Sequence, residues 1–329
     1  MKALVTGATG FIGSNLVREL LEDGLAVRVL VRPGSDRRAI AGLPVETVEG
    51  DLRDGGSLTR ALDGCDFLFH AAAQYSFWTP DPKLIYETNV GGTRRLLEAA
   101  RATGIRKVVY TSSESTVAVP GPGALGTEDG VSRPEELAGH YKRSKLEAER
   151  VALEACRSGL PVVVVNPTTP IGPWDLKPTP TGRIILDFLN RRMPAYVNTG
   201  LNVVHVKDVA RGHLLALRKG RVGERYLLGN RNLTLKQILD MLARITGLPA
   251  PRLRIPLLLA LFAGYMDELL SGRVRGSPPR IPVAAVKTAR HFRHFDCSKA
   301  VRELGLPQTP VEKALEDAVR WFRENGYAS

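Results

Sequence analysis

Gly7-Ala8-Thr9-Gly10-Phe11-Ile12-Gly13 is the stretch of sequence that decides the fold. It follows the apolar run Lys2–Thr6 directly and opens a helical pattern over Ile12–Glu22. Between a strand and a helix, the first glycine allows a tight turn and the second lets the backbone approach a pyrophosphate. The third lets the helix pack close to the strand, and N–H groups at the helix start face the phosphate charge. An ordinary strand-to-helix turn is the alternative. We predict a dinucleotide site that includes Gly7, Thr9, Gly10, Phe11, Ile12 and Gly13.

Strands and helices alternate beyond this motif. Further strands are expected at Ala26–Val31, Val45–Glu49, Phe67–His70, Lys107–Tyr110 and Pro161–Val165, and the clearest helices at Leu84–Ala102 and Leu137–Cys156. The apolar runs are continuous rather than alternating, as in strands buried on both faces of a parallel sheet. We therefore predict an α/β fold, with a Rossmann-type doubly wound parallel sheet in residues 1–168. Residues 169–329 are predicted to form mainly a smaller C-terminal α/β substrate lobe, with some segments returning to the sheet.

The chain is 329 residues long and 43% hydrophobic, which suffices for a sizeable core. Its longest apolar run, Ile255–Met266, is shorter than the roughly 18 residues that a membrane span needs. An ordinary buried helix is the favoured interpretation of this run, and apolar surface bordering the substrate is the alternative. The N-terminus begins at once as a strand, so we expect neither a signal peptide nor a transmembrane segment.

Charge and cysteine usage exclude several classes of protein. The net charge is +12, but the basic residues are dispersed and no aromatic array accompanies them, which argues against nucleic-acid binding. The positive charge is still compatible with binding of anionic ligands or with association with a membrane surface. The three cysteines show no pairing pattern, which fits the reducing cytoplasm, and the six histidines show no convincing metal-ligand spacing.

The choice of cofactor is read at the end of the second strand, where Arg32 follows Val31. An arginine there accommodates the 2′-phosphate of NADP, with Ser35 and Arg37 as further donors. Asp36 could instead bind the ribose of NAD, so NADP is favoured and NAD stays open. Further along, Asp51 and Leu52 follow the third strand, where an acidic side chain can accept from the adenine amino group. Ala71 and Ala72 follow the fourth strand and would let the cofactor lie against backbone.

Tyr141 and Lys145 lie four residues apart and hence on one face of a helix. A free tyrosine has a pKa near 10, and a nearby ammonium favours the phenolate and lowers that pKa. Ser113 follows the fifth strand, at the sheet edge where ligands bind, and its hydroxyl can hydrogen-bond a reacting carbonyl. Ser115 and Thr116 are the alternatives for this role. We predict that Ser113, Tyr141 and Lys145 are the catalytic residues.

The chain resembles the extended short-chain dehydrogenases/reductases, the NAD-dependent epimerase/dehydratase family. The motifs that carry this resemblance occur in the family's order: Gly7–Gly13, Asp51-Leu52, His70-Ala71-Ala72, Asn89-Val90-x-Gly92-Thr93, Thr111-Ser112-Ser113, Tyr141-x-x-x-Lys145 and Asn166-Pro167. The resemblance implies that Ser113 polarises the substrate oxygen, Tyr141 exchanges a proton, and Lys145 tunes Tyr141 and binds ribose. It also implies that Asn166, Pro167 and Thr168 line the nicotinamide and that Asn89 belongs to the cofactor site. A homodimer through the two long helices is a further expectation from the family.

A narrower resemblance is to the dihydroflavonol-reductase-like branch and to bacterial hopanoid-associated sugar epimerases. It rests on Asn166–Pro173, Lys177–Arg183 and Thr199–Asn202. It implies an NAD(P)-dependent epimerase or reductase beside hopanoid lipid synthesis. An NADPH-dependent ketone or aldehyde reductase is one alternative, and a non-catalytic NAD(P)-sensing protein is another.

The substrate is expected to carry little phosphate. Relatives that bind nucleotide sugars commonly carry an arginine before the motif that begins at His205, and Gly200–Val204 contains none. A sugar, a lipid-linked sugar or a small ketone would fit. Lys177, Arg183 and Arg211 could still form an unconventional anion site.

Overall fold

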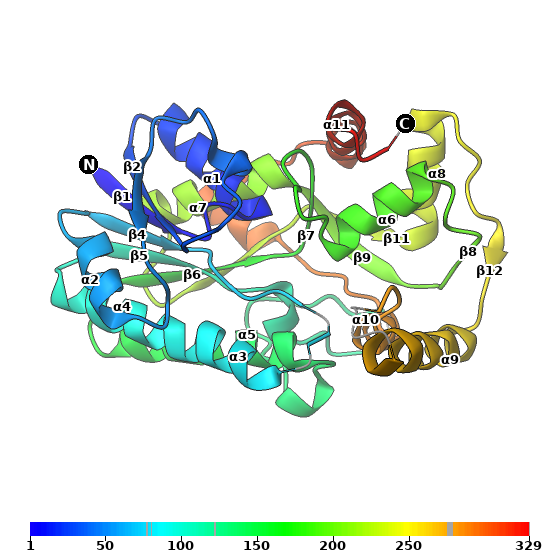
Figure 1. Cartoon of the computed structure of the whole chain (residues 1–329), viewed down its shortest axis with the longest axis horizontal. Helices are drawn as coiled ribbons and strands as arrows, with labels where there is room; N and C mark the ends of the chain where they lie inside the picture. Colours follow the sequence, from blue (N-terminus) through cyan, green and yellow to red (C-terminus); the bar gives the residue numbers. More distant parts are fainter. Residues whose placement is uncertain (77, 80, 122, 275–278, 329) are drawn as a thin grey trace.

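The computed structural model describes residues 1–76, 78–79, 81–121, 123–274 and 279–328, and its centre is one sheet of seven parallel strands (Figure 1). In spatial order the strands are β10 (Arg225–Leu228), β6 (Val162–Pro167), β5 (Lys107–Thr111), β4 (Phe67–His70), β1 (Lys2–Thr6), β2 (Ala26–Val31) and β3 (Glu46–Glu49). The order reverses between β1 and β4, which is where a doubly wound sheet binds its ligand. The predicted Rossmann-type fold is confirmed.

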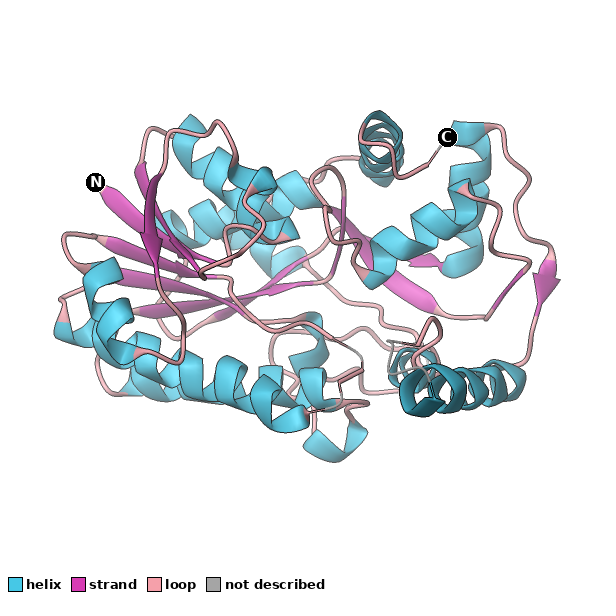
Figure 2. Ribbon diagram, in the orientation of Figure 1, coloured by secondary structure: helices cyan, strands magenta, loops and turns pink. Residues whose placement is uncertain are grey.

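Helices cover both faces of this sheet (Figure 2). One face carries α1 (Phe11–Glu22) and α7 (Val206–Lys219), and the other carries α2 (Gly55–Leu62), α4 (Gly92–Ala102) and α5 (His140–Arg157). Successive side chains of β1 point to opposite faces of the sheet: Val5 packs with α1 and α7, whereas Leu4 packs with α2 and α4. Burial on both faces explains why the strand sequences are continuously apolar.

The residues after β6 build a smaller α/β lobe. A three-stranded sheet joins β7 (Thr169–Ile171), β9 (Gly200–His205) and β11 (Arg231–Thr234), and β8 (Ala195–Tyr196) pairs with β12 (Leu253–Arg254). The lobe core is formed with α6 (Pro180–Leu189), α8 (Leu235–Thr246) and α11 (Val311–Glu324). From this half of the chain, α7, β10 and the turn η6 (Ala300–Leu304) return to the main sheet. We still propose residue 168 as the boundary between the Rossmann-type part and the smaller lobe.

Two helices differ in detail from those expected. The helix expected at Leu84–Ala102 begins earlier, as α3 (Pro82–Tyr86), and contains a π-helical turn, η2 (Glu87–Gly91), before α4. The helix expected from Leu137 begins only at His140, because Gly139 has a φ of 85° and the short turn η4 (Pro134–Glu136) precedes it. A left-handed residue cannot continue an α-helix, so the glycine sets the start of α5.

The apolar run Ile255–Met266 does not form the buried helix that we favoured. It forms α9 (Leu257–Asp267), which lies at one end of the molecule and continues as η5 (Glu268–Val274), with α10 (Val283–Thr288) packed beside it (Figure 1). Most of its large apolar side chains are exposed, including Leu258 and Phe262. Only Ala260 and Gly264 of α9 are buried, because the helix is apolar all round and touches the protein along one side. Among the described residues no helix is long and apolar enough to cross a membrane.

Candidate active site and cofactor site

The glycine-rich turn between β1 and α1 is shaped by close backbone contacts. Gly7 has a φ of 75°, and a Cβ added to it would lie 2.7 Å from the backbone nitrogen of Ala72. A Cβ on Gly13 would lie 2.0 Å from the carbonyl oxygen of Gly7, so any side chain there would push the helix off the strand. No described side chain caps α1, and its first turn carries no acidic residue. Its N–H groups are therefore available to an anion such as a pyrophosphate.

A buried hydrogen-bond chain holds the backbone opposite this turn. The hydroxyl of Thr93 donates to the carbonyl oxygen of Asn89 at 2.6 Å, so His70 Nε2 must donate to Thr93 Oγ1 at 2.9 Å. His70 Nδ1 then accepts from Thr6 Oγ1 at 2.7 Å, and Thr6 Oγ1 accepts from the N–H of Ala72 at 3.2 Å. Burial lowers the pKa of His70 to about 3, which keeps the imidazole neutral in this role. Ala71 and Ala72 are thus fixed against Gly7.

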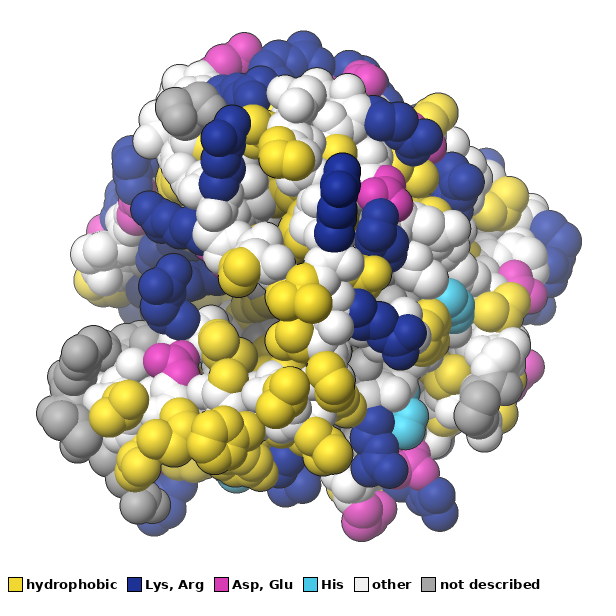
Figure 3. Space-filling model, turned by 90° about the vertical axis from the view of Figure 1, so that its right-hand side faces the viewer, with side chains coloured by type: hydrophobic (Ala, Val, Ile, Leu, Met, Phe, Trp, Pro, Cys, Tyr) yellow, Lys and Arg dark blue, Asp and Glu magenta, His cyan; other side chains and the backbone are white. Residues whose placement is uncertain are grey.

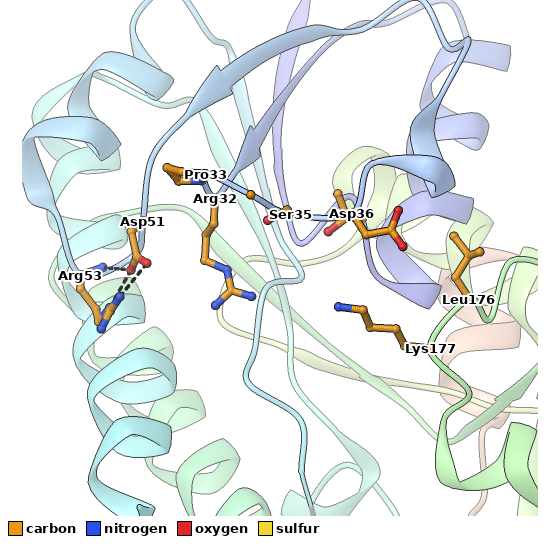
Figure 4. A pocket seen from close by; sticks show the side chains of 10 residues that line it. Arg32, Pro33, Ser35, Asp36, Asp51, Arg53, Leu176 and Lys177 are labelled. Atoms are coloured by element: carbon orange, nitrogen blue, oxygen red, sulfur yellow. Dashed lines mark hydrogen bonds and ion pairs between the residues drawn. The ribbon is translucent and has the colours of Figure 1, made fainter.

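A cavity of about 550 Å³ opens at the carboxyl ends of β2 and β3 (Figure 4). It is lined by Thr9, Arg32, Pro33, Gly34, Ser35, Asp36, Asp51, Arg53, Leu176 and Lys177. The side chains of Arg32 and Lys177 both point into it, and neither hydrogen-bonds or ion-pairs with any described side chain (Figure 4). Asp36 is occupied by Arg38, whose Nη2 lies 2.7 Å from its carboxylate, and this contact lowers the pKa of Asp36 to about 2. Two free cations and an occupied aspartate favour an anionic group in this cavity.

Of Lys177, Arg183 and Arg211, which the sequence offered as an anion site, Arg211 is bound within the protein. Arg211 lies on α7 and binds the carboxylate of Glu19 on α1 at 2.8 Å. Lys177 faces the cavity beside Arg32 instead, as Figure 4 shows.

The acidic residue of the third strand and the asparagine of η2 both have partners within the protein. Asp51 lines the cavity, but Arg53 Nε lies 3.0 Å from its carboxylate and lowers its pKa. Leu52 is buried, and a Cβ on Gly92 would touch its side chain. Asn89 accepts from the N–H of Gln74 at 2.7 Å and donates to Ser144 Oγ at 2.9 Å. It therefore ties the segment after β4 to α5.

Tyr141 and Lys145 stand in the first turns of α5; Lys145 is buried, and Tyr141 is partly exposed. Lys145 Nζ donates to the carbonyl oxygen of Thr111 at 2.6 Å, at the carboxyl end of β5. The hydroxyl of Thr111 is held at 2.8 Å by His213 Nε2, whose Nδ1 donates to the carbonyl oxygen of Val209 at 2.7 Å. Desolvation lowers the pKa of Lys145 to about 8, against the opposing charge of Glu149.

The pKa of Tyr141 moves in the direction opposite to our expectation. Burial raises it, and the negative charge of Glu114 raises it further. Lys145 Nζ is hydrogen-bonded to the strand carbonyl in this structure. The ring of Tyr75 packs edge-on against Tyr141 with centroids 4.5 Å apart, which shields the phenol from water. At neutral pH Tyr141 is therefore a protonated phenol, suited to donate a proton.

Ser113 lies directly after β5 and begins the short turn η3 (Glu114–Thr116). Its hydroxyl oxygen accepts from the N–H of Ser115 at 3.2 Å and from Ser115 Oγ at 3.0 Å. Because the Ser113 oxygen is the acceptor in both contacts, its hydroxyl proton stays available. Ser113 can therefore donate a hydrogen bond to a carbonyl oxygen. Thr116 is instead fully buried and donates to Glu149 at 2.7 Å, so the structure separates Ser113 from this alternative.

A buried ion pair behind these residues escaped the sequence analysis. Glu149 on α5 lies 3.0 Å from Arg225 on β10, and it also accepts from Asn166 Nδ2 at 2.8 Å. Asn166 in turn donates to the carbonyl oxygen of Ser113 at 3.1 Å. The spacing Tyr141–Lys145–Glu149 places the carboxylate on the same helix face, so Glu149 could have been found. Arg225 gives no local signal, because its partner is 76 positions away.

Together these residues occupy the carboxyl edge of the parallel sheet, where such folds bind ligands. Gly7, Ala71, Ser113 and Asn166 come from the ends of four adjacent strands, β1, β4, β5 and β6. The uncapped turn of α1 and the cationic cavity suit a dinucleotide, which supplies or accepts hydride when bound. The residues present therefore fit the cofactor that the glycine motif predicts.

Comparison with known proteins agrees with this geometry. The model of the NAD dependent epimerase/dehydratase family matches residues 3–229, and the chain belongs to this family of extended short-chain oxidoreductases. It is 50% identical to a putative dihydroflavonol 4-reductase from Synechocystis sp., over 98% of this chain and 95% of that protein. It is 43% identical to sterol demethylase protein B from Methylococcus capsulatus, over 99% of both chains.

A solved structure with bound cofactor shows the same fold. The dTDP-glucose 4,6-dehydratase DesIV from Streptomyces venezuelae, with NAD and TYD bound, superimposes with a TM-score of 0.80 at 27% identity. The match covers 100% of this chain and 99% of that one. The fold and family are thereby shown, while reductase and epimerase activities are both represented among the similar proteins.

Proposed function

We propose that this protein is an NADP-dependent reductase that acts on a carbonyl carbon of a polycyclic or isoprenoid lipid. The observation that carries the proposal is Tyr141 at the start of α5, with its pKa raised by desolvation and by Glu114, and with Lys145 four residues on. A phenol with a raised pKa stays protonated at neutral pH and can donate its proton. The bound cofactor would supply hydride to the carbonyl carbon.

In this reaction the chain's own residues would polarise the carbonyl group, protonate its oxygen and hold the cofactor in position. Ser113 would donate a hydrogen bond from its hydroxyl to the carbonyl oxygen and keep its proton, which increases the positive character of the reacting carbon. Tyr141 would then deliver its phenolic proton to the same oxygen as negative charge develops there. Lys145 would hold the ribose and stabilise the phenolate left behind. Glu149 and Arg225 would keep Asn166 and the backbone of Ser113 in place.

The preference for NADP over NAD rests on the cavity beside β2. Arg32 and Lys177 point into it, with no described partner for either side chain, whereas Asp36 is held by Arg38. A guanidinium can bind a 2′-phosphate with two hydrogen bonds, and an ammonium adds a second charge. A free aspartate would be needed to favour the 2′-hydroxyl of NAD instead.

The lipid character of the substrate is supported by two observations. The similar protein from Methylococcus capsulatus is named for sterol demethylation, and the match spans both chains. In addition, strand β9 (Gly200–His205) contains no arginine that could bind a nucleotide diphosphate. A ketone of the hopanoid or sterol type, converted in the cytoplasm, fits both observations.

Epimerisation of a sugar in hopanoid metabolism is the second candidate. A nucleoside-diphosphate-sugar epimerase from Pseudomonas aeruginosa shares the fold at 28% identity, which favours it. An epimerase returns the hydride to the substrate, so it consumes no cofactor overall.

The test is a reaction of the purified protein with NADPH deuterated at the transferred position. The substrates are a sterol ketone, a small water-soluble ketone, UDP-glucose and UDP-galactose. The proposed function predicts NADPH oxidation with deuterium on the new carbinol carbon of a ketone. In a parallel reaction with the oxidised cofactor, interconversion of the two sugar nucleotides without net cofactor reduction would establish the epimerase instead. If cofactor binds but none of these substrates reacts, a cofactor-sensing protein becomes the better description.

A further inference from the structure

The exposed side of α9 and η5 carries an unusual density of large apolar side chains. We call these the apolar face: Leu258, Leu259, Phe262, Tyr265, Met266, Leu269 and Leu270. Leu258 is 78% exposed and Phe262 is 67% exposed, values that are rare for such residues in a folded protein. Figure 3 shows apolar side chains gathered in one band across the lower part of this end of the molecule. A contiguous patch of this kind usually marks a surface that is covered in function.

The acidic residues within this segment are turned toward the protein. Asp267 accepts from the backbone N–H of Ile281 at 2.7 Å and from Ser271 Oγ at 3.0 Å. Glu268 accepts from the backbone N–H of Val283 at 2.7 Å. Through these hydrogen bonds both carboxylates connect the segment that begins α10 to the helix α9–η5. Neither carboxylate is part of the apolar face.

The apolar face is bordered by positive charge. The exposed cations close to it in the chain are Arg252, Arg254, Arg280, Lys287 and Arg290. None of these five forms an ion pair with a described carboxylate, and Lys287 Nζ lies 5.7 Å from the ring of Tyr265. In Figure 3 dark blue Lys and Arg side chains lie above the yellow band and to its right. The protein as a whole carries a net charge of +12.

We propose that the apolar face is a docking surface for an anionic lipid bilayer. An apolar helix with a basic border is the arrangement that lies in the membrane interface, with its apolar side chains among the acyl chains. The cations would meet the lipid phosphates, whose attraction acts over about one Debye length. The helix α9 has 11 residues and would lie on the bilayer rather than cross it.

A second copy of the chain is a less suitable occupant of the same surface. A symmetric dimer would bring the apolar face against itself, and with it the two basic borders. Like charges placed opposite each other disfavour such a contact. A bilayer of anionic lipids satisfies the apolar side chains and the cations together.

The docking surface adjoins the catalytic helix through α10. Lys142 Nζ donates to Thr288 Oγ1 of α10 at 3.0 Å, and a Cβ on Gly139 would lie 3.2 Å from the Cβ of Ala284. Because α10 packs against α9 and is hydrogen-bonded to the first turn of α5, one helix connects the apolar face to the element that carries Tyr141. Docking would therefore bring a lipid substrate close to Tyr141, a consequence that rests on the proposed function, whereas docking itself does not.

The experiment is co-sedimentation of the full chain with two kinds of vesicle, pure phosphatidylcholine and an equimolar mixture with phosphatidylglycerol. We expect binding to the mixed vesicles, weaker binding to the neutral ones, and loss of binding as salt is raised. The variant Leu258→Ser/Phe262→Ser should bind at least tenfold more weakly. Val222→Ser is the matched control, because Val222 is 52% exposed and lies outside the apolar face. It should bind like the wild type.

A second pair of variants tests the charge. Arg252→Glu/Arg254→Glu should lose binding to the mixed vesicles only, while Arg101→Glu, an exposed arginine on α4, should not. Circular dichroism and reduction of the water-soluble ketone should be unchanged in all variants, which separates docking from the proposed reaction. Equal binding by Leu258→Ser/Phe262→Ser and wild type would overturn the proposal. So would a wild-type dimer in sedimentation velocity that this variant converts to a monomer, because a second copy would then be the occupant.

Discussion

The two ends of the cofactor site are built in opposite ways. At the catalytic end, Lys145, Thr111 and His213 form a chain of short contacts within the protein and are shielded from solvent. At the end beside β2, Arg32 and Lys177 are exposed, and no described side chain binds them. Buried polar groups must be satisfied internally, which fixes their geometry. Exposed unpaired cations fix no geometry by themselves but select the charge of a ligand.

Because of this difference, cofactor specificity and catalysis can be altered separately. Changes at the buried end should affect turnover and stability, and changes at the exposed end should affect the choice of cofactor.

The largest expected effect is that of Tyr141→Phe. Removing the phenolic proton should lower kcat by roughly 10²- to 10⁴-fold, because no other described donor replaces it. Cofactor affinity should change little, since the ring is retained. Stopped-flow measurement of hydride transfer and fluorescence titration of NADPH check the two parts. A variant with wild-type turnover would show that the proton comes from another group.

The buried end should also make the protein sensitive to acid. Burial lowers the pKa of His213 to about 4 and that of His70 to about 3, whereas an unfolded histidine titrates near 6.5. The unfolded state therefore binds more protons, and stability falls as the pH drops from about 6.5 through 4. The expected loss is on the order of 3 kcal/mol for His213 alone. Urea unfolding at several pH values measures it, and His213→Gln should flatten the dependence.

The exposed end should decide the cofactor. Arg32→Asp should weaken NADPH binding by about 10- to 150-fold, the equivalent of roughly 1.5–3 kcal/mol for a charge-assisted bond. NADH binding should stay nearly constant. Arg37→Asp is the matched control, because Arg37, which the sequence offered as a further donor, is paired with Glu49 and does not line the cavity. Equal affinity of the wild type for both cofactors, measured by fluorescence titration, would contradict the assignment of Arg32.

The smallest effect is expected for Lys177→Ala. A single exposed ammonium contributes about 1 kcal/mol or less, so NADPH binding should weaken by less than tenfold and the loss should shrink at high salt. Lys236→Ala, on α8 of the lobe, serves as control. Titration at low and high ionic strength makes the measurement. A loss that salt does not reduce would mean that Lys177 contributes by packing.

Local patterns in the sequence were enough for the fold and for the residues that lie close together in the chain. Gly7–Gly13 could be predicted because turn, strand and helix follow one another directly, and Tyr141 and Lys145 because a helix sets their spacing. Glu149 and Arg225 could not be paired, since only the return of β10 to the sheet brings them together. The pKa of Tyr141 depends on desolvation by the folded chain and on Glu114, which no local pattern reveals.

The exposure of α9 shows a different limit. Its composition is that of a core helix, and in most proteins such a segment would be buried. Whether it is covered depends on how much protein lies above it, and among the described elements α10 packs against α9 while most of its large side chains stay exposed. Composition predicts what a helix would prefer as its surroundings but not whether the same chain provides them.

The π-helical turn η2 makes the helix at residues 82–102 sensitive to length rather than to composition. Its hydrogen bonds span one residue more than those of an α-helix, so the turn holds one extra residue without breaking the helix. Deleting one residue from 87–91 would restore regular winding and rotate everything before it by about 100°. Asn89 would then lose its place opposite Gln74 and Ser144, although Gly7–Gly13, Tyr141 and Lys145 would all be retained. In this helix the register is itself a determinant of the active site.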